Sequence, residues 1–355
     1  MKKFHPYRNL LILVVLGLIV YSLIGKITGL KNIGAVFQNF TPIFLILALI
    51  TFLITYLANA LKLKVLLEAQ GYDFKFRDLM KYGMVGAFAI HFLPVGNFGE
   101  SALNFYLLRQ KGVKTSSAIS LFLTRLIFDY LAFFTLFTIS LAFLPVHPSL
   151  NLKLKIGFFV VLFVLVAGSL YINYLLKRPK KFNQRTIPIL KYLKKSMHFI
   201  QHFKASTDPH QYFEKMASEL RLEMIKNTQL GPAVRLLISS LLYWLSDISI
   251  LYFALLGFGL VLNPFSVIFA YAIAIIAGII SFLPAGIGVL EATLILILGS
   301  FSTNIPAISL AVLGYRFISL WLSMPLGLIA FYRLNDAKLL FLNNKNSAKI
   351  EVKKN

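Results

Sequence analysis

The chain has 355 residues, of which 58% are hydrophobic and only 14% are charged. Soluble domains carry about 25% charged residues, and several apolar stretches here approach or exceed the roughly 20 residues that span a bilayer. Lipid must therefore be the solvent for much of the chain, which excludes a soluble catalytic domain. The formal net charge of +23 does not indicate nucleic-acid binding, because the basic residues stand mostly between the apolar runs and no recognition motif accompanies them.

The hydrophobic segments, taken in chain order, predict an all-α polytopic membrane protein with about eight such segments. The first follows a short basic stretch and resembles a signal peptide. No small-residue cleavage site follows it, so we expect a retained helix. Six segments are predicted to be full transmembrane spans: 10–25, 42–61, 117–143, 156–176, 233–256 and 305–332. Two further segments, 80–108 and 265–300, are interrupted by Pro and Gly and are predicted to form broken re-entrant helical hairpins.

Polar stretches complete the predicted organisation. Residues 177–232 are basic and contain too little apolar sequence for a large domain, so we expect one or two amphipathic helices on the membrane surface. Met197–Phe199 and Tyr212–Phe213 are expected to lie against lipid, and binding of a soluble partner by this cytoplasmic loop stays open. Residues 1–335 then form a single transmembrane domain, followed by a disordered cytoplasmic tail at 336–355.

The distribution of Lys and Arg predicts the orientation. With the N-terminus in the cytoplasm, thirty of the 36 basic residues lie on the cytoplasmic side and four lie in outer loops. This is the bias of the positive-inside rule. We therefore expect a multi-pass protein of the cytoplasmic (inner) membrane with both termini in the cytoplasm. The bias is the same if each broken segment is a pair of full spans, because two crossings keep the parity.

A short motif occurs twice. One copy reads FLPVGNFGE and ends at Glu100, and the other reads FLPAGIGVLE and ends at Glu291. An arginine follows each glutamate 25 residues later, at Arg125 and at Arg316. Each motif lies in a broken segment between two long spans, so the two copies mark corresponding parts of an internal repeat.

The predicted orientation gives the two copies of the repeat opposite directions. The broken segment of the first repeat, about 10–143, enters from the cytoplasm. That of the second repeat, about 156–332, enters from outside. An inverted-topology repeat of this kind is typical of transporters.

The residues expected to form the two breaks are Pro94, Gly96, Gly99, Pro284, Gly286 and Gly288. Proline interrupts a helix, and glycine permits sharp turns and close approach of the backbone. Non-helical backbone at membrane depth is tolerated only where it is packed in protein or lines a wet cavity. Two such hairpins with charges nearby favour a cavity, and the alternative is a pair of kinked structural helices.

Six ionisable residues fall in or beside the apolar segments: Glu100, Arg125, Asp129, Asp247, Glu291 and Arg316. Each costs roughly 2.5–3.5 kcal/mol at a helix centre, so they must pair, approach the interface or face water. In the functional interpretation each Glu pairs with its Arg in the cavity wall, where the guanidinium fork matches the oxygens of a lipid phosphate.

A purely structural interpretation of these charges also stands. Arg125 and Asp129 are four residues apart, so they share a helix face and can pair with each other. Glu100 and Glu291 each sit near the start of a helix, where the helix dipole favours an acidic side chain. Asp247 is a separate candidate in either interpretation.

Arg109 and Lys111 are expected at the cytoplasmic mouth of the first hairpin. There they either attract anionic headgroups or only help to orient the chain, as the positive-inside rule describes. The chain has no cysteine, and we find neither a phosphate-cradling loop nor a dinucleotide motif. We therefore expect no cofactor and no metal.

Four stretches, LPVGNFGESALNFYLLRQKG, LTRLIFD, LPAGIGVLEA and GYRFISLWLSMPLGL, resemble the lysylphosphatidylglycerol synthase transmembrane (flippase-like) family. The resemblance runs over roughly 10–332 and implies a multi-spanning inner-membrane protein linked to lipid translocation. In two-domain members a soluble domain aminoacylates phosphatidylglycerol and the membrane part moves the product across. The 355 residues leave no room for that domain, so we do not expect lysyl transfer.

Two positions depart from the family pattern. Members often carry a basic residue where Asn104 stands and an acid where Thr124 stands. The substrate therefore stays open, while the resemblance carries over best to Glu100, Glu291 and Arg316. Our leading hypothesis is a flippase or transporter for an anionic or phosphate-bearing lipid. The alternatives are a membrane-embedded lipid-modifying transferase, in which paired carboxylates serve as acid and base, and an accessory membrane subunit.

Overall fold

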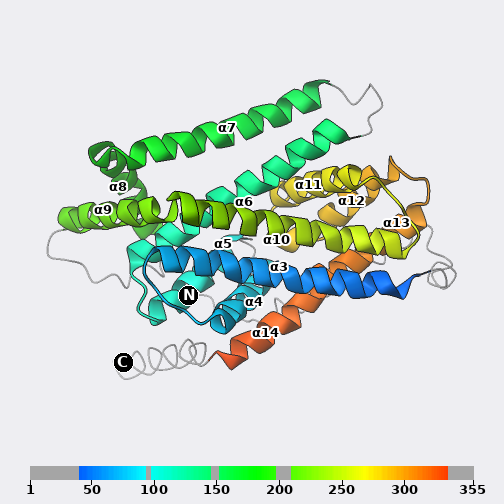
Figure 1. Ribbon diagram of the computed structural model, residues 1–355, viewed down its shortest axis with the longest axis horizontal. Coiled ribbons are helices and arrows are strands. Elements are labelled where there is room, and N and C mark those ends of the chain that lie inside the picture. The colour runs from blue at the N-terminus through cyan, green and yellow to red at the C-terminus, as the bar shows by residue number, and fades with distance from the viewer. Residues whose placement is uncertain (1–39, 93–96, 145–151, 197–208, 335–355) are drawn as a thin grey trace, which may run out of the picture.

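The computed structural model describes residues 40–92, 97–144, 152–196 and 209–334 (Figure 1). These residues form helices and no strands, which confirms the all-α prediction. The helices are α3 (Pro42–Ala69), α4 (Phe76–Phe92), α5 (Asn97–Gln110), α6 (Thr115–Phe143), α7 (Leu152–Leu176), α8 (Pro179–Ser196), α9 (Pro209–Asn227), α10 (Leu230–Gly257), α11 (Pro264–Ile280), the 3₁₀ turn η2 (Pro284–Gly286), α12 (Val289–Gly299), α13 (Ile305–Arg316), the π-helical η3 (Phe317–Leu322) and α14 (Ser323–Arg333).

Four of the described helical segments are long and apolar enough to cross a membrane: α3, α6, α10 and the continuous run from α13 through α14. They match four of the six predicted spans, and α7 forms where a fifth was expected. The first predicted span, 10–25, lies outside the described residues, as do the predicted tail at 336–355 and Met197–Phe199. Large apolar side chains on α3 and α7 are exposed, such as Leu53 and Phe163, which fits helices whose solvent is lipid.

Helix α3 is longer than expected. It begins with Pro42, a residue pre-organised for the first helical position, and continues past the predicted end at residue 61 to Ala69. Leu63 and Leu66 in this extension are fully buried, so the apolar face continues and packing holds the last two turns. Residues 62–69 therefore continue the helix beyond the predicted end of the span, and their place on the cytoplasmic side stays a prediction.

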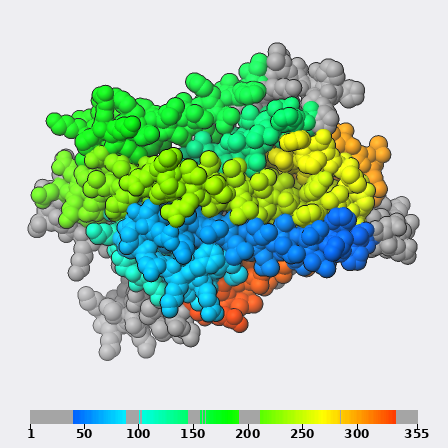
Figure 2. Space-filling view, in the orientation of Figure 1, coloured from blue at the N-terminus to red at the C-terminus, as the bar shows by residue number. Residues whose placement is uncertain are grey.

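Helices α3 and α10 lie side by side and antiparallel (Figure 1). At one end the Thr41 amide donates to the Gly257 carbonyl oxygen over 2.9 Å. At the other end Arg235 Nη1 lies 3.4 Å from Glu68 Oε2. In the space-filling view, α3 (blue) and α10 (yellow-green) lie against each other (Figure 2).

The second predicted broken segment is interrupted, and the first contains a stretch, 93–96, that lies outside the described residues. Helix α4 ends at Phe92 and α5 begins at Asn97, while α11 ends at Ile280 and α12 begins at Val289. Helix α4 follows the C-terminal end of α3, and α11 follows the C-terminal end of α10. Because α3 and α10 are antiparallel, the two broken segments start from opposite ends of this pair (Figure 1).

The basic stretch forms two helices, α8 and α9, that pack on the rest of the molecule. Phe213 of α9 is only 6% exposed and packs with Leu190 and Met216, and Ile119 of α6 lies against this cluster. The expectation that Phe213 lies against lipid is therefore wrong. Protein covers the apolar face of α9, because α9 lies along α6. Ser116 of α6 donates a hydrogen bond to Glu219 Oε2 of α9.

Candidate functional site

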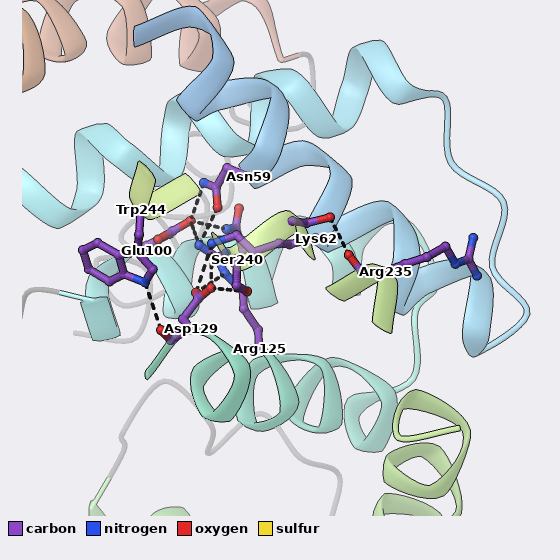
Figure 3. Close-up of polar contacts among 10 residues, drawn as sticks. Asn59, Lys62, Glu100, Arg125, Asp129, Arg235, Ser240 and Trp244 are labelled. Atoms are coloured by element: carbon purple, nitrogen blue, oxygen red, sulfur yellow. Dashed lines mark hydrogen bonds and ion pairs between the residues drawn. The ribbon is translucent and has the colours of Figure 1, made fainter. Parts of the chain in front are cut away.

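The first site is a buried cluster around Glu100 and Arg125 (Figure 3). Arg125 Nη2 lies 2.8 Å from Glu100 Oε1 and donates to Asn59 Oδ1 over 2.7 Å. The amide of Asn59 donates to the same Glu100 oxygen over 3.2 Å. Glu100 is 4% exposed and Arg125 has 12% of its side chain exposed, so the pair is almost removed from solvent.

A second carboxylate, that of Asp129, joins this cluster. Lys62 Nζ lies 2.9 Å from Asp129 Oδ1, and Ser240 Oγ donates to the same oxygen over 2.7 Å. Arg125 Nε lies 3.4 Å from Asp129 Oδ2. Two cations therefore face two carboxylates, and the cluster is neutral, as a site at membrane depth requires.

Local sequence places these side chains. Asn59 and Lys62 are three residues apart on α3, so they project from the same face of the helix. Arg125 and Asp129 lie four residues apart on α6 for the same reason. Glu100 lies in the first turn of α5 and packs against Gly86 of α4, where an added Cβ would stand only 2.5 Å from Glu100 Cγ.

The corresponding pair in the second half is Glu291 and Arg316. Arg316 Nε lies 2.7 Å from Glu291 Oε1, and its Nη2 donates to the Ala285 carbonyl oxygen over 2.7 Å. The other Glu291 oxygen accepts from the Gly288 amide over 2.7 Å, as a capping residue of α12 does. Glu291 is fully buried and Arg316 is 3% exposed, so the pair is closed to solvent.

The broken backbone of the second segment builds part of this site. Gly286 and Gly288 have φ of 61° and 87°, a region open to glycine at little cost, as the sequence predicted. Ala285 also adopts a positive φ, of 54°, and its carbonyl is the one that Arg316 binds. Strained residues of this kind are found where the surrounding contacts fix them, often at functional sites.

Asp247 of α10 forms a third polar centre. It accepts hydrogen bonds from the hydroxyls of Tyr271 on α11 and of Tyr315 on α13, the second over 3.1 Å. Tyr243 lies one turn before it on α10 and within electrostatic range of Asp247, Glu100 and Asp129. These hydrogen bonds join α10 to α11 and α13, and Tyr315 directly precedes Arg316 in the chain.

The structure brings together the residue pairs that the 25-residue spacing predicted. Both structural alternatives are present as well, because Arg125 contacts Asp129 and Glu291 caps its helix. These contacts do not exclude one another, since each carboxylate has two oxygens and each guanidinium has several donors. Whether a cavity separates the two hairpins stays a prediction.

Other predicted residues lie elsewhere. Gly99 lies within α5, because the helix already begins at Asn97, so its place in the break is wrong. Pro94 and Gly96 lie outside the described residues, and Pro284 begins η2. Arg109 is exposed and donates to the Val113 carbonyl oxygen over 2.7 Å, and Lys111 is exposed in the following turn.

The two departures from the family pattern have different surroundings. Asn104 is buried and its amide lies 3.5 Å from Glu100 Oε1, so it belongs to the first cluster. Thr124 instead accepts a hydrogen bond from Asn227 of α9 over 3.2 Å. Only the first departure therefore changes the polarity around the Glu–Arg pair.

In the first cluster, sequence reasoning missed three participants: Asn59, Lys62 and Ser240. Lys62 was counted among the cytoplasmic basic residues, yet it is fully buried and bound to Asp129. The helical spacing of Ser240, Trp244 and Asp247 on α10 was the available signal, because all three lie on one face. That face carries the hydrogen bonds from Ser240 to the Asp129 side chain and from Trp244 Nε1 to the Asp129 carbonyl oxygen.

Comparison with known proteins agrees with this architecture. Residues 10–327 match the family described as the lysylphosphatidylglycerol synthase TM region. The chain belongs to this family. A UPF0104 membrane protein of Methanocaldococcus jannaschii is 25% identical over 334 residues, which cover 93% of this chain and 96% of that relative. The chain is thus a multi-pass membrane protein of the lysylphosphatidylglycerol synthase transmembrane family.

Proposed function

We propose that the protein moves an anionic, phosphate-bearing lipid across the cytoplasmic membrane. The observation that carries this proposal is the occurrence of two buried Glu–Arg pairs, each built where a helix resumes after a break. Membership of a family whose name refers to lipid synthesis supports a lipid as the substrate class.

The burial of these pairs is the first argument for a role beyond stability. Charged residues at membrane depth are costly, and a buried ion pair often stabilises a protein no more than apolar residues of the same volume. Two pairs at equivalent places in two repeats are therefore poorly explained by stability alone. Intramembrane ionisable residues typically mark the path of a substrate.

Arg316 is the group best suited to a lipid phosphate. Its guanidinium already binds a carboxylate oxygen and a backbone carbonyl oxygen, and phosphate oxygens match the same planar fork. Because Glu291 occupies this fork in a closed, buried pair, a phosphate reaches it only when α12 and α13 separate. Substrate binding is thereby coupled to movement of the second broken hairpin.

The helix that carries Arg316 has a feature suited to such movement. Directly after Arg316 the backbone forms the π-helical η3 before α14 resumes. Short π-helical segments within α-helices are rare and occur frequently at functional sites. A π-helical segment beside Arg316 permits a local change of helical register without melting of the span.

Leaflet exchange in proteoliposomes tests the proposal. We expect wild type to exchange a fluorescent phosphatidylglycerol well above empty vesicles, and Arg316→Ala to lose at least about tenfold of that rate, since roughly 1.4 kcal/mol corresponds to a factor of ten. Arg333→Ala is the matched control, because Arg333 ends the same helical run but is exposed.

Two results would contradict the proposal. Exchange by Arg316→Ala at the wild-type rate would remove Arg316 from the site. Absence of exchange by wild type with several lipids, including under an imposed proton gradient, would refute translocation. Turnover of a radiolabelled lipid and donor by the purified chain would then favour the membrane-embedded transferase.

A further inference from the structure

A groove of about 550 Å³ lies between α3 and α10, and its lining contains no residue of the two Glu–Arg pairs. Its charged lining consists of Lys64, Glu68 and Arg235, and its apolar lining includes Leu61, Phe76 and Ile238. The volume falls within the roughly 300–1,000 Å³ of small-molecule sites. Arg235 is labelled in Figure 3, to one side of the buried cluster.

The three charges of the groove carry a net charge of +1. Glu68 lies 3.5 Å from Lys64 Nζ through one oxygen and 3.4 Å from Arg235 Nη1 through the other. All three side chains are more than a third exposed. Exposed ion pairs contribute roughly 0–1 kcal/mol, so a phosphate can compete with Glu68 for these cations. Binding of one phosphodiester would neutralise the groove.

Two apolar residues of the lining, Leu61 and Ile238, lie farther from the helix ends than the two cations do. Leu61 precedes Lys64 by three residues on α3, and Ile238 follows Arg235 by three residues on α10, which is about 4.5 Å along each helix axis. Lys64 is near the C-terminal end of α3 and Arg235 is near the N-terminal end of α10, so in both cases the apolar residue is farther from the helix end. Ile238 is 59% exposed and Leu61 is 36% exposed.

This arrangement matches an amphiphile rather than a soluble anion. The cations lie toward the helix ends, as headgroup contacts would, and exposed apolar side chains lie farther along the helices, as acyl-chain contacts would. We propose that the groove binds an anionic phospholipid of the adjacent leaflet, with its phosphodiester between Lys64 and Arg235 and its acyl chains along Ile238 and Leu61. The proposed lipid binding does not depend on transport. Only the idea that the substrate enters the protein through this groove rests on the proposed function.

Native mass spectrometry of the purified protein, titrated with phosphatidylglycerol and separately with phosphatidylcholine, tests the proposal. We expect selective retention of phosphatidylglycerol. The double variant Lys64→Gln/Arg235→Gln should weaken its binding about 25-fold, because each basic side chain near an anionic headgroup contributes about fivefold. Lys81→Gln/Arg333→Gln removes the same charge from two positions outside the groove lining and should bind as wild type does.

Glu68→Gln provides a test in the opposite direction. It removes the competing carboxylate and raises the net charge of the groove, so we expect phosphatidylglycerol to bind about fivefold more tightly. Weaker binding by Glu68→Gln would overturn the proposal. Equal retention of the two lipids by wild type, or unchanged binding by the double variant, would also overturn it.

The binding and exchange measurements separate the two proposals. Selective binding without any lipid exchange leaves the groove standing and refutes translocation. Exchange without selective binding leaves translocation standing and refutes the groove.

Discussion

At the scale of single residues, the buried ion pair of Lys62 and Asp129 makes the most direct stability prediction. Lys62→Met removes the cation and leaves Asp129, whose side chain is 19% exposed, with a weaker contact to Arg125 and a hydrogen bond from Ser240. Loss of one partner from a buried pair typically costs about 3–5 kcal/mol, and these remaining contacts place the expected loss near 3 kcal/mol. The midpoint of thermal unfolding in detergent measures it.

Two companion variants make this prediction specific. Lys64→Met, two residues along the same helix, changes an exposed lysine paired only with exposed Glu68, so its midpoint should stay close to wild type. Adding Asp129→Asn to Lys62→Met should recover part of the loss, because the uncompensated charge is removed. A double variant less stable than both single variants would contradict this account.

The same residues indicate how much of the site the sequence could reveal. The equal spacing of Glu100 to Arg125 and of Glu291 to Arg316 was sufficient to predict both pairs. Lys62 was hidden because it stands just beyond a predicted span, where basic residues normally face the cytoplasm. Lys62 is buried in the protein only because α3 continues to Ala69, and that continuation depends on packing against other helices.

At the scale of elements, the break between α11 and α12 depends on Gly286. Its φ of 61° disfavours any other residue, and an added Cβ would stand 3.1 Å from the Cα of Gly278 on α11. We expect Gly286→Ala to destabilise the protein by about 1–3 kcal/mol, the typical cost of a strained backbone position. Gly314→Ala, in α13 with nothing within 4 Å of the new Cβ, should be neutral or slightly stabilising.

The midpoints of thermal unfolding of the two glycine variants in detergent separate backbone strain at residue 286 from the general effect of replacing a glycine by alanine. Equal midpoints for Gly286→Ala and wild type would mean that the turn relaxes around the added methyl group. The comparison also bears on prediction from sequence, since Pro284, Gly286 and Gly288 located the second break correctly, whereas Pro94 and Gly96 lie outside the described residues. The helix that follows the first break nonetheless begins before Gly99, because a glycine near a break does not have to lie in it.

At the scale of the whole molecule, matching helix lengths support the internal repeat. Helices α3 and α10 each have 28 residues, and both α6 and the run Ile305–Arg333 have 29. The antiparallel contact of α3 with α10 relates equivalent elements of the two halves. An inverted repeat, predicted from charge and motif spacing, requires this relation.

The predicted inverted orientation can be tested by labelling, and the chain is well suited to this because it has no cysteine, so any introduced cysteine is the single one. Lys111 and Thr303 are exposed residues in equivalent turns, before α6 and before α13. In intact cells a membrane-impermeant maleimide should label Thr303→Cys, whereas Lys111→Cys should react only after permeabilisation.

The labelling pattern decides between two arrangements. Opposite accessibility means that the two Glu–Arg pairs are approached from opposite faces of the membrane, so one can open while the other stays closed. That is the property alternating access requires. Labelling of both cysteines from the same side would place both hairpins on one face and refute the inverted repeat. The buried Glu–Arg pairs would then have to act, if at all, as parts of a one-sided site such as that of a lipid-modifying enzyme.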